Sequence, residues 1–285
     1  MRLAYSAVFV LSLLLHNIPA SAQEWQELKS EHFIVCFEQD ENFAKDVSYK
    51  AEGYYQRIAS DLGYSRHSNF WTWDNRVKIY IYKEKAAFLK ATGQPEWSEG
   101  MADYTHKQIV SYAWSSGFLE SLLPHEMAHL IFRDFVGFKG EVPLWLDEGV
   151  AQWEEEPKRA EYKSASQAYL KKNILLSLED MMKLDIRDVK DIDKKIHIRS
   201  IRRKNGERII LLIAGENLVT TYYLQSVSLV GFLIEKYGSV SFVDFCRVLR
   251  DGKSLEEALQ AAYSTYSIQA IQDLEDRWVE YLEES

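Results

Sequence analysis

Apolar and polar residues in the first half of the chain recur with two kinds of spacing, one typical of strands and one typical of helices. Runs rich in β-branched and aromatic residues predict strands at residues 32–37, 77–82 and 108–114. Apolar residues at helical spacing predict a long helix over residues 41–62 and a shorter one that starts at residues 83–88. This order predicts a small twisted mixed sheet with helices on one face. The edge of the last strand could pair with an extended peptide.

The second half of the chain is mainly helical. Helical spacing of apolar residues predicts helices at residues 118–135, 219–237, 241–249, 254–262 and 268–282. Pro143 precedes a further helix, and Gly238 ends the helix over residues 219–237. Residues 195–201 and 208–213 flank Asn205-Gly206, which predicts a β-hairpin. The predicted fold class is α+β, with a small mixed sheet followed by a mainly helical C-terminal subdomain that carries an inserted hairpin.

Three local features bear on the predicted elements. Pro124 allows a helix that begins near Leu123 with the proline in its first turn, or a helix that is kinked there, and the first arrangement costs less. Residues 154–172 are strongly polar, which predicts a solvated helix and loop. His32 and His197 each stand alone on a predicted strand and are interpreted as structural residues, not ligands.

Composition and charge narrow the class of protein. Apolar residues make up 47% of the 285 residues and charged residues 27%, which is ordinary for a globular chain, and the 13% of aromatic residues argues against disorder. The net charge of −9 argues against a nucleic-acid partner, because such a partner needs clustered basic side chains.

The N-terminus has the pattern of a secretory leader. Arg2 is followed by an apolar run over residues 3–15, and Ala20-Ser21-Ala22 fits a small-x-small cleavage site. Cleavage after Ala22 is favoured over an uncleaved anchor, so we expect an exported protein, periplasmic or secreted, with no stable membrane span after cleavage. In that setting Cys36 and Cys246 either form one disulfide or are buried thiols, and the sequence favours neither.

Two short stretches carry the candidate chemistry. The first contains His125-Glu126-x-x-His129, which on a helix puts two imidazoles one turn apart on the same face. The second is Trp145-Leu146-Asp147-Glu148-Gly149, with Glu148 lying 19 positions after His129. A catalytic Zn²⁺ takes three protein ligands and keeps a fourth position for water. The alternative is that the histidines and Glu148 are ordinary surface or core residues, although a glycine that permits close helix packing agrees with the metal site.

The spacing and wording of these stretches resemble the gluzincin zinc metallopeptidases, and more specifically the small bacterial peptidase-MA-like proteins. The resemblance is strong over residues 100–153 and 222–278 and weak over residues 154–218. It implies that His125, His129 and Glu148 bind Zn²⁺, and that Glu126 is the base that takes a proton from the zinc-bound water. The Gly-x-Met-x-Asn pattern of zinc aminopeptidases is absent, so exopeptidase activity has no support.

Two supporting roles follow from the same resemblance. The tetrahedral intermediate needs an electrophile, and Tyr223 is the candidate with Tyr222 as runner-up, unless both rings are packed core. Asp147 is expected either to orient one of the ligand histidines or to lie at the surface.

The sequence therefore predicts four regions and one main function. The regions are residues 1–22 as signal peptide, 23–153 as sheet and zinc-site helices, 154–218 as a polar insert with the hairpin, and 219–285 as the helical subdomain. The main hypothesis is a zinc-dependent metallopeptidase that acts on a peptide or protein substrate. The alternatives are a weakly active or inactive binding or scaffold protein on the same fold, and a zinc hydrolase of a cell-wall amide.

Overall fold

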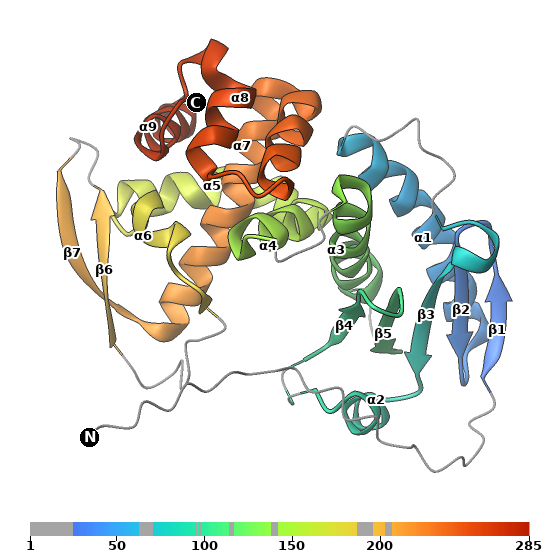
Figure 1. Ribbon diagram of the computed structural model, residues 1–285. Coiled ribbons are helices and arrows are strands. Elements are labelled where there is room, and N and C mark those ends of the chain that lie inside the picture. The colour runs from blue at the N-terminus through green and yellow to red at the C-terminus, as the bar shows by residue number, and fades with distance from the viewer. Residues whose placement is uncertain are drawn as a thin grey trace, which may run out of the picture.

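A five-stranded mixed sheet forms one end of the molecule (Figure 1). Its spatial order is β1-β2-β3-β5-β4, with bounds β1 (Gln26–Lys29), β2 (Phe33–Phe37), β3 (Val77–Tyr82), β4 (Gly100–Asp103) and β5 (Gln108–Tyr112). The β2–β3 and β3–β5 pairs are parallel, and β1 and β4 run antiparallel at the two edges. The three predicted strands are confirmed. The edge strands went unpredicted because four residues are too few to show a period.

The computed structural model describes residues 25–62, 71–94, 96, 98–113, 117–137, 142–186, 196–202 and 207–284. Within these residues the α+β class is confirmed, with the sheet, a separate two-stranded hairpin and a helical C-terminal region. The signal peptide at residues 1–22 and the Asn205-Gly206 turn lie outside the described residues. The division into four regions stays a prediction.

The strand order corrects one expectation about the sheet. The last strand before the metal-motif helix, β5, lies inside the sheet between β3 and β4, so its edges are already paired. Among the described strands, the one beside it with a free edge is β4. The chain returns from β4 through residues 104–107 into β5, and this tight turn makes β4 the outer strand.

Helices of the first half pack beside this sheet. They are α1 (Glu41–Asp61), the single turn η1 (Trp73–Asn75) and α2 (Lys85–Thr92). The side chain of Asp40 accepts a hydrogen bond from the backbone N–H of Phe43, which satisfies a free donor at the start of α1. Val47, Ala51 and Ile58 recur at helical spacing and are fully buried. The long predicted helix is therefore confirmed.

The helix that carries the His-Glu motif begins in an unusual way. A π-helical turn, η2 (Phe118–Leu122), runs directly into α3 (Leu123–Val136). Pro124 is the second residue of α3, but the residues before it are already helical, so it lies at the junction of the π turn and the α-helix and neither of the two arrangements is confirmed. The next helix, α4 (Leu144–Trp153), follows Pro143 as predicted.

The C-terminal half wraps around one long helix. Its helices are α5 (Glu156–Lys171), α6 (Leu178–Met182), α7 (Gly215–Arg250), α8 (Leu255–Tyr263), the turn η4 (Ser264–Tyr266) and α9 (Ile271–Glu283). Gly238 breaks α7 with a φ of 84°, which agrees with a helix that ends there. In the described chain, Asn217–Arg250 is long and apolar enough to cross a membrane, but 67% of its most apolar stretch is buried in the fold, as in a core helix.

The predicted hairpin is confirmed as β6 (Ile196–Arg202) and β7 (Arg208–Ala214), with Ile198 opposite Leu212. His197 lies on β6. The hairpin is held to the region of α6, because Ser177 and Ser200 exchange a hydroxyl hydrogen bond of 2.8 Å and the backbone N–H of Ser200 donates to Asp180.

Two expectations about polar and sulfur-containing residues are corrected by burial. Glu154 and Glu155 are 0% and 5% exposed, so the polar segment is not simply solvated, because each acid has a basic or imidazole partner. Cys36 on β2 and Cys246 on α7 are both free and buried, so the disulfide alternative is wrong.

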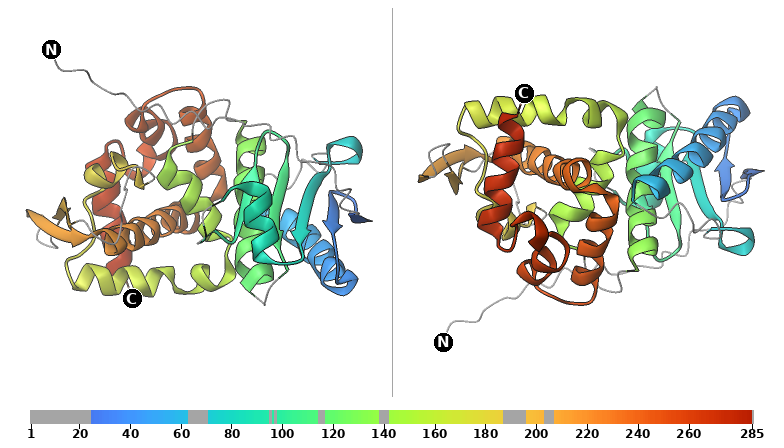
Figure 2. Two further views of the ribbon diagram at one scale, coloured as in Figure 1. Left: turned by 90° about the horizontal axis from the view of Figure 1, so that it is seen from below. Right: turned by 90° about the horizontal axis from the view of Figure 1, so that it is seen from above.

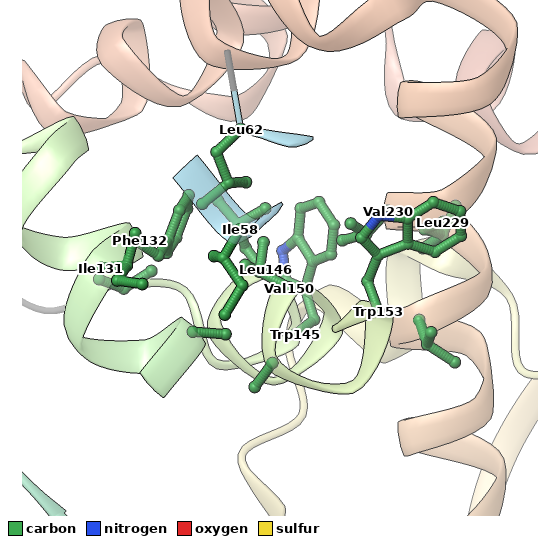
Figure 3. Packing of buried hydrophobic residues seen from close by; sticks show 14 of the residues in the cluster. Ile58, Leu62, Ile131, Phe132, Trp145, Leu146, Val150, Trp153, Leu229 and Val230 are labelled. Atoms are coloured by element: carbon green, nitrogen blue, oxygen red, sulfur yellow. The ribbon is translucent and has the colours of Figure 1, made fainter. Parts of the chain in front are cut away.

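Helix α4 joins the two halves through a shared core. α3 and α4 lie between the sheet and the C-terminal helices (Figures 1 and 2). Side chains from α1, α3, α4 and α7 meet there in one apolar cluster, including Phe132, Leu146, Trp153 and Val230 (Figure 3). The two helices lie very close at Gly149, where an added Cβ would lie 2.6 Å from the backbone oxygen of Ser226 and 2.7 Å from Val230 Cγ2.

Replacing Gly149 with alanine should therefore push α4 away from α7. We expect the free energy of unfolding to fall by about 1–3 kcal/mol, since backbone cannot move aside as a flexible side chain does. Gly53→Ala on α1 is the matched control, because nothing lies within 4 Å of its Cβ position. It should stabilise by about 0.5–1 kcal/mol through helix propensity. Urea unfolding of both variants tests the contact, and a neutral Gly149→Ala would refute it.

The buried Glu154 should make stability depend on pH. Burial raises the pKa of this carboxyl to about 7, and Asp61 adds to the shift while Arg57 opposes it. The folded state then holds a proton between about pH 4.5 and about pH 7 that the unfolded state has lost, so stability falls as pH rises through this window. Relative to Glu154→Gln, the wild type should lose on the order of 2 kcal/mol between about pH 5 and about pH 8. Parallel pH dependences of the two melting temperatures would contradict this.

Candidate metal centre

Three candidate ligands converge between α3 and α4. His125 and His129 lie one turn apart on α3, and Glu148 reaches them from α4. One ligand atom from each lies within 4.8 Å of the other two. The two Nε2 atoms are 3.2 Å apart, and His125 Nε2 is 3.8 Å from Glu148 Oε2. These distances fit one metal ion, since two ligands about 2.1 Å from a tetrahedral zinc are about 3.4 Å apart.

Hydrogen bonds at the far side of each imidazole fix which nitrogen faces the centre. His129 Nδ1 lies 3.1 Å from Asp147 Oδ1, and His125 Nδ1 lies 2.9 Å from Glu155 Oε1. Each Nδ1 therefore donates its hydrogen to a carboxylate, which leaves a lone pair on each Nε2. The two Nε2 atoms, 3.2 Å apart, therefore need a cation between them, either a proton or a metal ion. The donor set itself thus fits a bound metal.

The carboxylate behind His129 belongs to a larger charged network. Asp147 Oδ2 accepts a hydrogen bond of 2.9 Å from Arg133, and the guanidinium carbon of Arg133 lies 4.0 Å from the ring centre of Tyr104. Burial would raise the pKa of Asp147, but His129 and Arg133 hold it below its usual value. Burial alone would lower the pKa of His129, but its pairing with Asp147 outweighs this and raises the pKa to about 9. A more basic imidazole is a stronger ligand.

The carboxylate behind His125 was not foreseen. Glu155 is 5% exposed and also accepts a hydrogen bond of 2.7 Å from Lys158. Burial would raise its pKa, but His125 and Lys158 lower it, so it stays ionised. Glu155 lies just after the end of α4 and seven positions beyond Glu148, in a run of three glutamates. Nothing in that spacing distinguishes it from its neighbours, so the fold was needed to find it.

Glu126 lies beside the two histidines on α3 and is 9% exposed. Burial raises its pKa above the usual value, Glu148 adds to the shift, and the imidazoles and the backbone N–H of Ala102 on β4 oppose it. A carboxylate with a raised pKa is a better proton acceptor than an exposed one. The contact with Ala102 also shows that the edge strand β4 runs beside the centre.

The tyrosine candidates lie on α7 near its contact with α4. Tyr222 is 1% exposed, and Tyr223 is half-buried with its ring centre 6.1 Å from that of Tyr222. Tyr223 lies on α7 three residues, about one helical turn, before Ser226, whose backbone oxygen lies against Gly149 of α4. Catalytic use of Tyr223 stays a prediction. Gln225 in the same stretch has a structural role, since its buried amide bonds both backbone groups of Leu176.

A hollow opens at the start of α4, one turn before Glu148. Its volume is about 290 Å³, and it is lined by the residues before and within the first turn of α4, by the end of α6 and by Tyr222. Leu144 lines it and is four residues from Glu148, so both lie on the same face of α4. Lys183 and Asp185 contribute opposite charges to its wall.

His32 belongs to the core of the first half and not to the centre. Its ring is stacked on Tyr55 at 4.0 Å, and its Nδ1 lies 2.6 Å from Glu52 Oε2. The interpretation of His32 as structural agrees with these contacts.

Comparison with known proteins supports a metallopeptidase-type fold. A family model described as the Peptidase MA superfamily matches residues 70–187, which include α3, α4 and both halves of the candidate ligand set. The match continues through α5 and α6, so the resemblance extends beyond residue 153 into the segment that we interpreted as an insert. It does not reach residues 222–278, where we also found a likeness. No curated protein matches the chain. Residues 70–187 are thus similar to Peptidase MA superfamily proteins.

Proposed function

We propose that the protein is a zinc-dependent metallopeptidase of the gluzincin type. The observation that carries the proposal is the convergence of two imidazole lone pairs and one carboxylate, with each imidazole fixed from behind by a separate ionised acid. Similarity to the Peptidase MA superfamily supports the same reaction class. His125, His129 and Glu148 would hold the zinc, which when bound would polarise the scissile carbonyl and activate water.

The protein's own groups perform the remaining steps. Glu126 accepts a proton from the attacking water and passes it to the leaving amine, and its burial suits it to both tasks. Asp147 and Glu155 keep the two imidazoles oriented. Tyr223 remains our candidate for the hydrogen-bond donor to the developing oxyanion.

A peptide substrate would bind along β4 as an added strand. In the described sheet β4 is an edge strand, and its Ala102 N–H already bonds Glu126, so an extended chain added along that edge would lie beside the base. The hollow beside Leu144 then lies on the same side of α4 as Glu148 and is suited to a substrate side chain. This arrangement supports peptide-bond hydrolysis over the cell-wall amide alternative, because strand addition requires a peptide backbone.

We also propose that the protein is exported, on the strength of the leader pattern in residues 1–22. Its place of action would be the periplasm or the exterior.

Substitutions at the centre should separate metal binding from catalysis. Glu148→Gln and His125→Ala each remove a ligand and should leave the purified protein without stoichiometric zinc. Glu126→Gln should retain zinc and lose activity by a factor of about 10²–10⁴, because only the base is removed. Zinc content by mass spectrometry and hydrolysis of an unfolded casein-like substrate provide the two readouts. Wild-type protein without zinc would end the proposal, and zinc without hydrolysis would favour the scaffold alternative.

The role of Glu155 can be tested through metal affinity alone. Glu155→Ala should lower zinc affinity about 10–100-fold, as is typical when a carboxylate behind a ligand histidine is lost. The zinc affinity of Glu155→Gln should lie between those of the wild type and Glu155→Ala, because glutamine keeps an acceptor oxygen but not the charge. Glu161→Ala, an exposed acid on α5, is the control. Competition with a chromophoric chelator measures all three. Equal affinities for Glu155→Ala and Glu161→Ala would show that Glu155 does not support the site.

A further inference from the structure

The hairpin β6–β7 has one face that the described part of the chain leaves uncovered. Residues two apart on a strand point to the same face, so Ile210 and Leu212 share one face of β7. We call this the outer face. Ile210 is 74% exposed and Leu212 is 65% exposed, whereas Ile213, which points the other way, is 6% exposed. The hairpin stands out from the helices in both figures of the whole fold (Figures 1 and 2).

The sequence of β7 is that of a strand covered on both sides. It reads Arg-Ile-Ile-Leu-Leu-Ile-Ala, without the polar alternation of a strand that has one side in water. The exposed Ile210 and Leu212 are therefore unusual for such a strand, which leads us to ask what covers this face.

Charge indicates what covers this face. Residues 196–214 contain five basic side chains and one acidic one, a net charge of +4, although the whole chain carries −9. Arg202 and Arg208 are register partners at the end of the hairpin next to its turn. A second copy of the chain is disfavoured, because two such hairpins packed face to face would bring like charges together. The occupant must be anionic as well as apolar.

The size of the outer face favours a lipid surface over a folded acidic protein. Two strands of seven residues, at about 3.3 Å per residue and about 4.8 Å apart, cover roughly 200 Å². A stable protein interface needs roughly 800 Å² on each partner. Shallow insertion into a bilayer needs only a few aliphatic side chains, with arginines nearby to meet lipid phosphates.

We propose that the outer face docks the protein on an anionic lipid bilayer. Ile210 and Leu212 enter the boundary between headgroups and acyl chains, and the net positive charge of the hairpin attracts it to lipid phosphates. The remainder of the chain carries −13 and is repelled by the same surface, so the hairpin alone approaches it. Ser177 and Asp180 hold the hairpin against the α6 region and thereby fix the orientation of the docked molecule. The inference does not depend on zinc or on peptidase activity.

Vesicle sedimentation of the purified full chain tests the proposal. Wild type should bind vesicles of phosphatidylglycerol with phosphatidylcholine at least about tenfold more tightly than vesicles of phosphatidylcholine alone, with a loss of binding at high salt. The double variant Ile210→Ser/Leu212→Ser and the double variant Arg202→Glu/Arg208→Glu should each weaken this binding about tenfold. Val240→Ser, which is equally exposed at 75% but lies on α7, should bind as wild type does.

A gain-of-binding variant guards against a hairpin that merely misfolds. Leu212→Trp should bind at least as tightly as wild type, because tryptophan favours the membrane interface. Wild type that ignores the anionic vesicles would overturn the proposal, as would equal binding by the serine double variant. Loss of binding in Leu212→Trp would do the same. Binding that needs the arginines but not the aliphatic residues would also overturn it, because it would show electrostatic adsorption without insertion of Ile210 and Leu212.

Discussion

The structure depends on one short helix, α4, which contacts α3 on one side and α7 on another. On α4, Asp147 and Glu148 reach the histidines of α3, while the next residue, Gly149, lies against the backbone of α7. Consecutive residues on a helix are about 100° apart, so neighbouring positions can serve different partners. The close approach at Gly149 sets the distance of α4 from α7, and the same rigid helix then carries the two acids to the centre. The packing of α4 against α7 therefore also determines where its two acids lie relative to the histidines of α3.

Burial, together with charged partners, sets the pKa values of the acids around the metal centre. Asp147, Glu154 and Glu155 are each almost without solvent contact. Two of them have imidazole and cationic partners and are held ionised, whereas Glu154 lies between the charges of Asp61, Arg57 and Arg159 and keeps a raised pKa. The difference arises from their partners, because α3 supplies the imidazoles, whereas Glu154 faces Asp61 and Arg57 of α1, about 100 residues earlier in the chain. A run of three glutamates therefore contains acids with opposite behaviour.

Local patterns in the sequence were enough to predict the elements whose apolar residues recur with a regular period. The strand at residues 77–82, the long α1 and the hairpin pairing could be predicted because their apolar periods are long. β1 and β4 could not, since four residues show no period, and without β4 the edge of the sheet was assigned to β5. At the centre, His125, His129 and Glu148 come together from two motifs in which spacing is informative. Glu155, Arg133 and Tyr104 are supplied by tertiary contacts, and no spacing rule marks them.

The π-helical turn before α3 affects how related chains would compare. Each π turn holds one residue more than the α-helical path it replaces, so it rotates the preceding segment by about 100° relative to the helix that follows. A chain that entered α3 without this turn would keep His125 and His129 in place but lack one residue between β5 and the motif. Alignments of such chains should therefore show a one-residue gap within residues 118–122 and unbroken correspondence from Leu123 onward. The ligand spacing is insulated from length changes upstream.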